Sequence, residues 1–296
     1  MSAPYKIALT TPEGVDLRVV NYRATDGVLL FGFLASPSGK AVRSKVGVIF
    51  VHGTRGSALV GAGFLAPYLA RYGYTAFAIN KRNSDINFEA SIFEDVAKDL
   101  AGAVMYLAGL GVPNIVLIGH SLGAIEATYY VGSERPASVK ALVLSGTPAS
   151  SPRSAVEDLR DVNPTDPEAE YQKLVTEAQM LAVRGKGDTL LIIPRGGGHG
   201  QMSMSAFSYL SYRGPQSRCS AVDWIEKVTV PVFLLAHALP DRGVSPEESE
   251  EIRAKAVATS SVESYTVKDA GHFYTDHEEE AAKAVADWLN RVGLPP

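Results

Sequence analysis

Cysteine is nearly missing from this sequence, and its scarcity restricts the chemistry that the chain can perform. Cys219 is the only cysteine among the 296 residues. Neither an intramolecular disulfide nor a metal site built from several cysteines can therefore form. A lone small thiol is more often a packed side chain than a catalytic nucleophile, so we expect Cys219 to be structural.

Concentrated positive charge is also missing. The formal net charge is −4, the isoelectric point lies near 5.9, and the chain contains no run of Lys and Arg. Proteins that bind nucleic acid usually present a basic face to the phosphates. We therefore expect no nucleic-acid partner.

Long apolar runs are absent as well. The longest, such as Val230 to Leu239, contain Pro and His and are too short to cross a bilayer. The first residues, Met1 to Lys6, lack the apolar segment of a secretory signal. These features favour a soluble cytoplasmic protein without a membrane partner.

Strand-like and helix-like segments alternate along most of the chain, which predicts a parallel sheet with helical crossovers. Segments 15–23 and 28–35 flank Asp26-Gly27, a strong hairpin signal, so we expect them to pair antiparallel. Segment 46–51 is continuously apolar, as expected of a strand buried on both faces. The other expected strands are 74–80, 114–118, 140–144, 230–236 and 261–267, and the expected helices are 57–72, 92–110, 121–134, 246–257 and 276–291.

The alternation stops after residue 146 and resumes after residue 222. The intervening segment contains Pro-rich turns, a long helical pattern at 167–183, a short apolar run at 189–193 and a helical pattern at 203–212. We interpret 147–222 as a mainly helical cap inserted after the sixth strand, with 1–146 and 223–296 as the core domain. Its apolar side chains could form the cap's own core or line a pocket; they are Met180, Leu181, Met202, Met204, Phe207, Leu210 and Tyr212.

The string Gly119-His120-Ser121-Leu122-Gly123 carries the strongest chemical signal. It fits the G-x-S-x-G pattern and lies between an expected strand and an expected helix. A sharp strand-to-helix turn strains the serine backbone and exposes its hydroxyl above the sheet edge, and larger side chains at the glycines would collide with neighbouring elements. We therefore predict that Ser121 is a nucleophile.

A serine hydroxyl needs a base, and the chain has six histidines. His272 follows the last expected strand, so it lies on a loop at the same sheet edge as Ser121. His52 begins a tight turn and is more simply a turn-stabilising group, while we expect His120 to point away from the Ser121 hydroxyl. His272 is therefore the predicted general base.

The base needs a carboxylate that orients it. Asp241 follows strand 230–236 after a short loop, at the carboxyl end where parallel sheets place their sites. Asp269 is closer to His272 in sequence but is more simply a turn former. We predict Asp241 as the acid, which gives the chain order Ser, Asp, His.

Two backbone N–H groups are expected to stabilise the oxyanion. Leu122 supplies one at the start of a helix, and Thr54 supplies the other from the glycine-containing loop after strand 46–51. Lys81 and Arg82 follow the next strand; they could meet an anionic substrate, but solvated loop charges are the simpler interpretation.

These motifs together resemble those of the α/β-hydrolase family. The resemblance covers nearly the whole chain and rests on His52-Gly53, Gly119 to Gly123, the Asp241 loop and Gly271-His272-Phe273. It implies an eight-stranded, mostly parallel sheet flanked by helices and hydrolysis through an acyl-enzyme. The turn before Asp241 reads Ala238-Leu239-Pro240, where such proteins commonly have Gly followed by acidic residues.

The function that we expect is hydrolysis of a carboxylic ester of a small molecule with an apolar portion. A lactone, thioester, amide or activated C–C bond would use the same groups, as would perhydrolysis, and a ligand-binding protein could retain a vestigial triad. Ser121 excludes the aspartate nucleophile of dehalogenases and epoxide hydrolases. The His and Cys content offers no ligand cluster and no dinucleotide loop occurs, so we expect neither a metal nor an organic cofactor.

Overall fold

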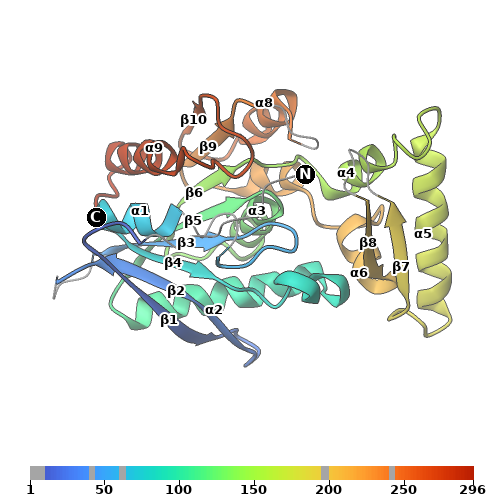
Figure 1. The fold of residues 1–296 in the computed structure, drawn as a ribbon, viewed down its shortest axis with the longest axis horizontal. Helices are drawn as coiled ribbons and strands as arrows, with labels where there is room; N and C mark the ends of the chain where they lie inside the picture. The colour runs from blue at the N-terminus through green and yellow to red at the C-terminus, as the bar shows by residue number, and fades with distance from the viewer. Residues whose placement is uncertain (1–10, 40–43, 60–64, 195–199, 240–243) are drawn as a thin grey trace.

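The computed structural model describes residues 11–39, 44–59, 65–194, 200–239 and 244–296. An eight-stranded sheet runs through the molecule in the order β1-β2-β4-β3-β5-β6-β9-β10 (Figure 1). β2 pairs antiparallel with both β1 and β4, and every other neighbouring pair is parallel. The strands are β1 (Val15–Arg23), β2 (Leu29–Pro37), β3 (Val46–Val51), β4 (Thr75–Ile79), β5 (Asn114–His120), β6 (Val139–Ser145), β9 (Val232–His237) and β10 (Val262–Val267).

The expected class is confirmed, including the hairpin around Asp26-Gly27 that starts the sheet. The helices outside 147–220 are α1 (Leu65–Arg71), α2 (Val96–Gly109), α3 (Leu122–Glu134), α7 (Ala221–Trp224), α8 (Pro246–Lys255) and α9 (Glu278–Arg291). Short 3-10 helices η2 (Asp85–Ala90), η3 (Phe93–Asp95) and η4 (Ile225–Lys227) connect them.

The sheet is buried because apolar side chains cover both of its faces. In β3, Ile49 and Val51 belong to the hydrophobic core shared with α2 and α3, whereas Val48 and Phe50 belong to the core shared with α1 and α9. Successive residues of a strand point to opposite faces, so a continuous apolar run serves both cores. Because both faces of the sheet are packed, the strands are held rigidly in place. The candidate site lies at the carboxyl ends of β3, β5 and β6.

Residues 147–222, which we call the cap segment, lie at one end of the molecule beside the sheet (Figure 1). They include α4 (Ser151–Asp158), α5 (Pro167–Val183), β7 (Leu190–Pro194), β8 (Gln201–Ser205) and α6 (Ala206–Arg213). The division into a core and an inserted cap remains a prediction.

The expected helix at 203–212 was wrong at its start. Residues 201–205 form β8, which pairs antiparallel with β7, and the helix begins at Ala206. Met202 and Met204 are buried while Ser203 between them is not, which is the two-residue period of a strand. The Ser205 hydroxyl then caps the helix by accepting a hydrogen bond from the Ser208 N–H at 3.1 Å.

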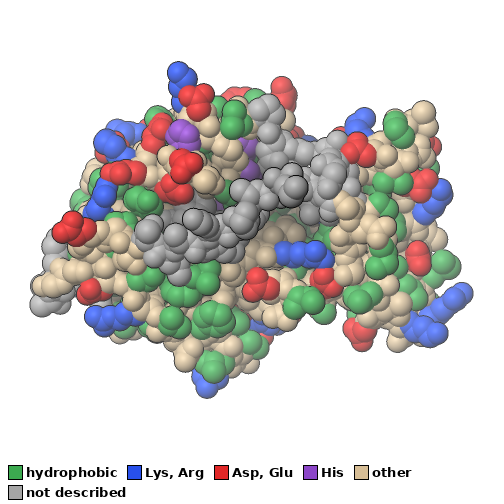
Figure 2. Space-filling view, viewed as in Figure 1, with side chains coloured by type: hydrophobic (Ala, Val, Ile, Leu, Met, Phe, Trp, Pro, Cys, Tyr) green, Lys and Arg blue, Asp and Glu red, His purple; other side chains and the backbone are tan. Residues whose placement is uncertain are grey.

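The described surface carries charge of both signs. On the face shown in Figure 2, basic and acidic side chains are interspersed over the residues that are coloured. None of the helices in the described part of the chain combines the length and hydrophobicity needed to cross a bilayer.

Candidate active site

Ser121 occupies a strained turn between β5 and α3. Its backbone has φ 55° and ψ −126°, a region that side chains other than glycine rarely adopt. Its N–H donates to the Ser145 carbonyl at the end of β6, 2.8 Å away, which ties the turn to the neighbouring strand. The side chain is half-buried at the carboxyl edge of the sheet. The strand–turn–helix geometry expected for this residue is confirmed.

Backbone contacts explain the glycines around Ser121. A Cβ on Gly119 would lie 2.4 Å from the Gly123 carbonyl oxygen, and one on Gly123 would lie 2.1 Å from the Val51 carbonyl oxygen. A Cβ on Gly53 would lie 2.9 Å from the Ser121 Cβ. The expectation that larger side chains collide here is confirmed, and the 52–56 loop is thereby placed directly against Ser121.

Hydrogen bonds within the 52–56 loop orient its backbone. The Gly53 carbonyl accepts from His52 Nδ1 at 2.9 Å and from the Gly56 N–H at 3.1 Å. The Gly53 carbonyl and the Thr54 N–H belong to one planar peptide and point in opposite directions, so fixing the first also orients the second. Thr54 is exposed at the mouth of this turn. Its convergence with the Leu122 N–H on one oxygen atom remains a prediction.

His52 holds that loop as a neutral imidazole. A carbonyl can only accept, so Nδ1 carries the proton, and Nε2 lies 2.8 Å from the Ser84 hydroxyl and accepts from the Lys81 N–H at 3.4 Å. Burial, and then the nearby Lys81 charge, hold the pKa of His52 well below its usual range. The interpretation of His52 as a turn-stabilising residue is therefore supported by its contacts.

His272 lies at the same edge of the sheet. A Cβ on Gly146, directly after β6, would be 3.1 Å from its Nδ1 and Cε1 atoms, and its ring is centred 4.5 Å from that of His120. His120 immediately precedes Ser121, so the predicted base lies over the turn that carries the predicted nucleophile. The transfer of a proton between Ser121 and His272 remains a prediction.

His237 contacts the predicted base, which sequence reasoning did not anticipate. Its Nδ1 donates to the Leu239 carbonyl, 2.9 Å away, because a carbonyl can only accept. His272 Nδ1 lies 3.4 Å from Nε2 of His237 and would donate to it if the His237 ring is neutral. This arrangement would leave the lone pair of a neutral His272 on Nε2, as a general base requires. Asp241 lies outside the described residues, so its contact with His272 remains a prediction.

A second set of hydrogen bonds fixes His120 beneath His272. Tyr274 donates to the Leu235 carbonyl at 2.8 Å and accepts from Ser145 Oγ at 3.1 Å. Ser145 Oγ therefore accepts from His120 Nδ1 at 3.2 Å. Burial, followed by the charges of His272 and His237, holds the pKa of His120 well below its usual range. His120 is thus a neutral, buried support for the base.

The expectation of solvated loop charges at Lys81 and Arg82 was wrong. The Lys81 ammonium is completely buried and paired with Glu126 of α3, whose pKa is raised by burial even though Lys81 and Asn83 oppose the shift. Arg82 binds Asp99 through Nε at 2.9 Å and Asp26 through Nη1 at 2.9 Å. Their acidic partners are distant in sequence, so no local pattern could reveal the pairing.

The remaining expectations concern Cys219, Asp269 and metals. Cys219 is buried, and burial followed by the nearby Glu126 carboxylate raises the pKa of its thiol. Asp269 adopts φ 58°, the left-handed backbone of a turn. Among the residues that the structure describes, no group of three or more His, Cys, Asp or Glu is arranged to hold a metal ion.

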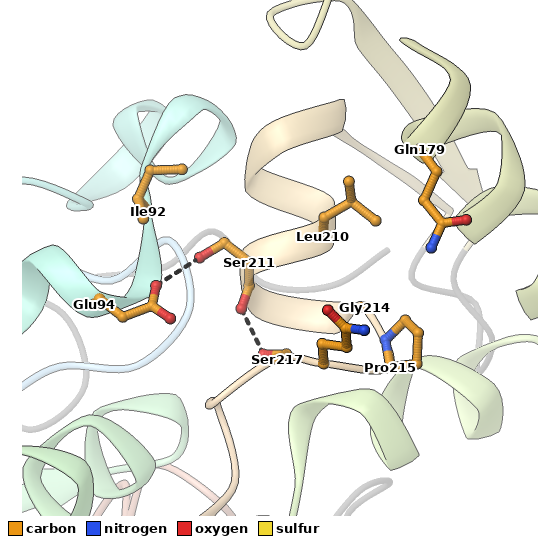
Figure 3. A pocket seen from close by; sticks show the side chains of 9 residues that line it. Ile92, Glu94, Gln179, Leu210, Ser211, Gly214, Pro215 and Ser217 are labelled. Atoms are coloured by element: carbon orange, nitrogen blue, oxygen red, sulfur yellow. Dashed lines mark hydrogen bonds between the residues drawn. The ribbon is translucent and has the colours of Figure 1, made fainter. Parts of the chain in front are cut away.

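A separate cavity of about 380 Å³ lies between the η3 region and the cap segment (Figure 3). Ile92 and Glu94 line one side, while Gln179 of α5 and Leu210 of α6 line the other. Ser121 is not among its lining residues. This cavity is therefore distinct from the candidate site.

Comparison with known proteins places the whole chain in one fold. Residues 47–179 match the alpha/beta hydrolase fold family. No significant match occurs among curated protein sequences. The hypothetical protein PA2218 of Pseudomonas aeruginosa superposes with a TM-score of 0.73 at 13% identity, covering 98% of both chains.

Some of the similar structures are named as esterases, from Rhodothermus marinus and Pyrococcus furiosus. An esterase of Pyrococcus furiosus has a TM-score of 0.67 at 20% identity, over 97% of this chain and 96% of that one. Est1E of Butyrivibrio proteoclasticus, which contains ferulic acid, has a TM-score of 0.67 at 19% identity, over 91% of this chain and 98% of that one. At such identities the likeness establishes the fold. The chain is an α/β-hydrolase fold protein with structural similarity to esterases.

Proposed function

We propose that this protein hydrolyses a carboxylic ester of a small molecule through an acyl-enzyme formed on Ser121. The observation that carries this proposal is the strained Ser121 backbone at the end of β5, held against the 52–56 loop. Backbone strain of this kind concentrates at functional sites and projects the hydroxyl toward a substrate. The esterases with the same fold support an ester as the first substrate class to test.

In the proposed mechanism His272 Nε2 removes the proton as Ser121 Oγ attacks the ester carbonyl. The Thr54 and Leu122 N–H groups stabilise the tetrahedral oxyanion, an effect worth roughly 3 kcal/mol for each donor. The protonated His272 then gives its proton to the leaving alcohol. Water attacks the acyl-enzyme with His272 again as the base; the bond between the acyl carbon and Ser121 Oγ then breaks, His272 returns the proton to Oγ, and the carboxylic acid leaves. Asp241 is the proposed acid that stabilises the imidazolium.

The decisive variant is Ser121→Ala, compared with Ser133→Ala near the other end of α3. The Ser133 hydroxyl is buried on the same helix and takes no part in the proposed mechanism, so its removal is a matched control. We expect Ser121→Ala to lower turnover of an aryl ester by about 10⁴-fold or more while the protein stays folded. A tenth of the wild-type activity remaining in Ser121→Ala would disprove the nucleophile assignment.

Covalent labelling tests the same serine without assuming a substrate. A fluorophosphonate should modify Ser121 in the wild type and leave Ser121→Ala unmodified, as read by mass spectrometry of the intact protein and its peptides. A panel of esters, lactones, thioesters and amides, with and without peroxide, then identifies the acyl acceptor and donor. Absence of both labelling and turnover would favour a ligand-binding protein instead.

A further inference from the structure

A buried polar network connects the 52–56 loop with α3 and the cap segment. Lys81 follows β4, and its ammonium donates to the His52 carbonyl at 2.9 Å and to Glu126 Oε2. The amide nitrogen of Asn83 donates to Glu126 Oε1 at 2.7 Å and to the Tyr212 hydroxyl at 2.9 Å. The network therefore begins at the loop that carries Thr54 and ends on α6.

The charged pair is completely enclosed. The side chains of Lys81 and Glu126 are both 0% exposed. Tyr212 of the cap segment binds Asn83 beside them and packs against Phe88 and Phe93. Placing two charges in such surroundings requires strong desolvation, and an apolar pair of similar volume is often as stable. Stability alone therefore does not account for this pair.

The hydrogen bonds of Lys81 show that the ion pair with Glu126 is connected to the backbone around Gly53. Lys81 fixes the carbonyl on one side of Gly53, while His52 Nδ1 and the Gly56 N–H fix the carbonyl of Gly53 itself. Both peptide planes around this flexible residue are thus set by hydrogen bonds. Glu126 lies one helical turn after Gly123, which packs against the Val51 and His52 carbonyls.

We propose that Lys81 and Glu126 are positioning residues that hold the 52–56 loop against the start of α3, so that the Thr54 and Leu122 N–H groups keep the spacing needed to bind an oxyanion. The proposal rests on the proposed hydrolytic function, because it assigns both donors to that reaction. It predicts that loss of the pair weakens binding of the transition state more than binding of the substrate.

The test uses the double variant Lys81→Met/Glu126→Gln, which removes both charges and keeps similar side-chain volumes. A displacement of about 1 Å in catalytic groups costs up to ~100-fold in rate, so we expect kcat on an aryl ester to fall about 10- to 100-fold with KM within twofold. The inhibition constant of a trifluoromethyl ketone analogue, which forms an oxyanion on the nucleophilic serine, should rise by the same factor. The matched control is Arg213→Met/Asp158→Asn, which removes a largely buried ion pair within the cap segment, away from the 52–56 loop, and should leave kcat unchanged.

Hydrogen exchange at residues 52–56 provides a readout that is independent of activity. The exchange of these amides should accelerate in the Lys81→Met/Glu126→Gln variant and not in the control. If that double variant does not fold, Lys81→Met alone replaces it, because Glu126, whose pKa is already raised by burial, can then take up a proton. Unchanged exchange at residues 52–56 in a folded variant, or an unchanged inhibition constant, would overturn the positioning role of Lys81 and Glu126. A wild type that is inactive and not labelled would instead overturn the proposed hydrolytic function.

Discussion

The substitution Gly123→Ala tests the close packing of α3 on β3, on which the geometry of the site depends. A Cβ at this position would lie 2.1 Å from the Val51 carbonyl oxygen and 2.5 Å from the His52 carbonyl oxygen. Ordinary contacts begin near 3.4 Å, so a gap of about 1.3 Å would have to open between two backbone segments. Neither segment can give way by rotating a side chain.

The expected cost follows from this displacement. Overpacking of a well-packed core destabilises by about 1–3 kcal/mol, and contact with backbone atoms places Gly123→Ala at the upper end of that range. Because the gap opens between the 52–56 loop and Leu122, we also expect ester turnover to fall by about 100-fold. Urea denaturation and steady-state kinetics on the same preparations measure both effects.

Gly109→Ala is the matched control. Gly109 is also in a helix, at the end of α2, but nothing lies within 4 Å of its added Cβ. Removing helical glycine flexibility at such a position should stabilise the protein by roughly 0.5–1 kcal/mol and leave turnover unchanged. If Gly123→Ala matched Gly109→Ala in both stability and turnover, the inferred packing of the turn would be refuted.

Two further predictions concern titration and the acid. His52 and His120 have folded-state pKa values below the ordinary value near 6.5. Below about pH 6.5 the unfolded chain therefore binds protons at these residues that the folded chain does not. The free energy of unfolding should fall as the pH drops below that value, by up to ~1.4 kcal/mol per pH unit for each histidine. His120→Asn should make stability depend less on pH, with the difference in bound protons growing from about 0.1 at pH 7.5 to about 0.9 at pH 5.5, as measured by urea denaturation across that range. An unchanged pH dependence would contradict the burial of a neutral His120. Asp241→Asn should lower kcat by up to ~10⁴-fold at neutral pH, whereas Asp269→Asn should cost little because Asp269 occupies a turn. The reverse ranking in side-by-side kinetics would transfer the role of the acid to Asp269.

Local sequence patterns were sufficient to predict most of the strands and helices of the core. Continuous apolar runs placed the central strands, the Asp26-Gly27 turn placed the hairpin, and the G-x-S-x-G string placed Ser121 between β5 and α3. Each of these features depends on residues that are neighbours in sequence. A helix was expected from residue 203, although Met202 and Met204 are buried with the two-residue period of a strand.

The surroundings of the predicted base were beyond the reach of such patterns. His120, His237 and His272 come from the ends of β5 and β9 and from the loop after β10, and their rings meet only because those ends lie at one edge of the sheet. The order of strands in a sheet decides such meetings. No spacing within the sequence encodes the contact between His237 and His272.

The sequence by itself determined that the chain folds around a buried parallel sheet and that a strained serine stands at its edge, because hydrophobic periodicity and glycine placement act over a few residues. Only the tertiary structure decided the surroundings of Lys81, because its partner Glu126 is 45 residues away and becomes a neighbour when α3 packs onto the sheet. A lysine after a strand favours solvent unless folding supplies a carboxylate within reach and excludes water from both. Burial of an ion pair is therefore a property of the assembled core, and it cannot be read from either residue alone.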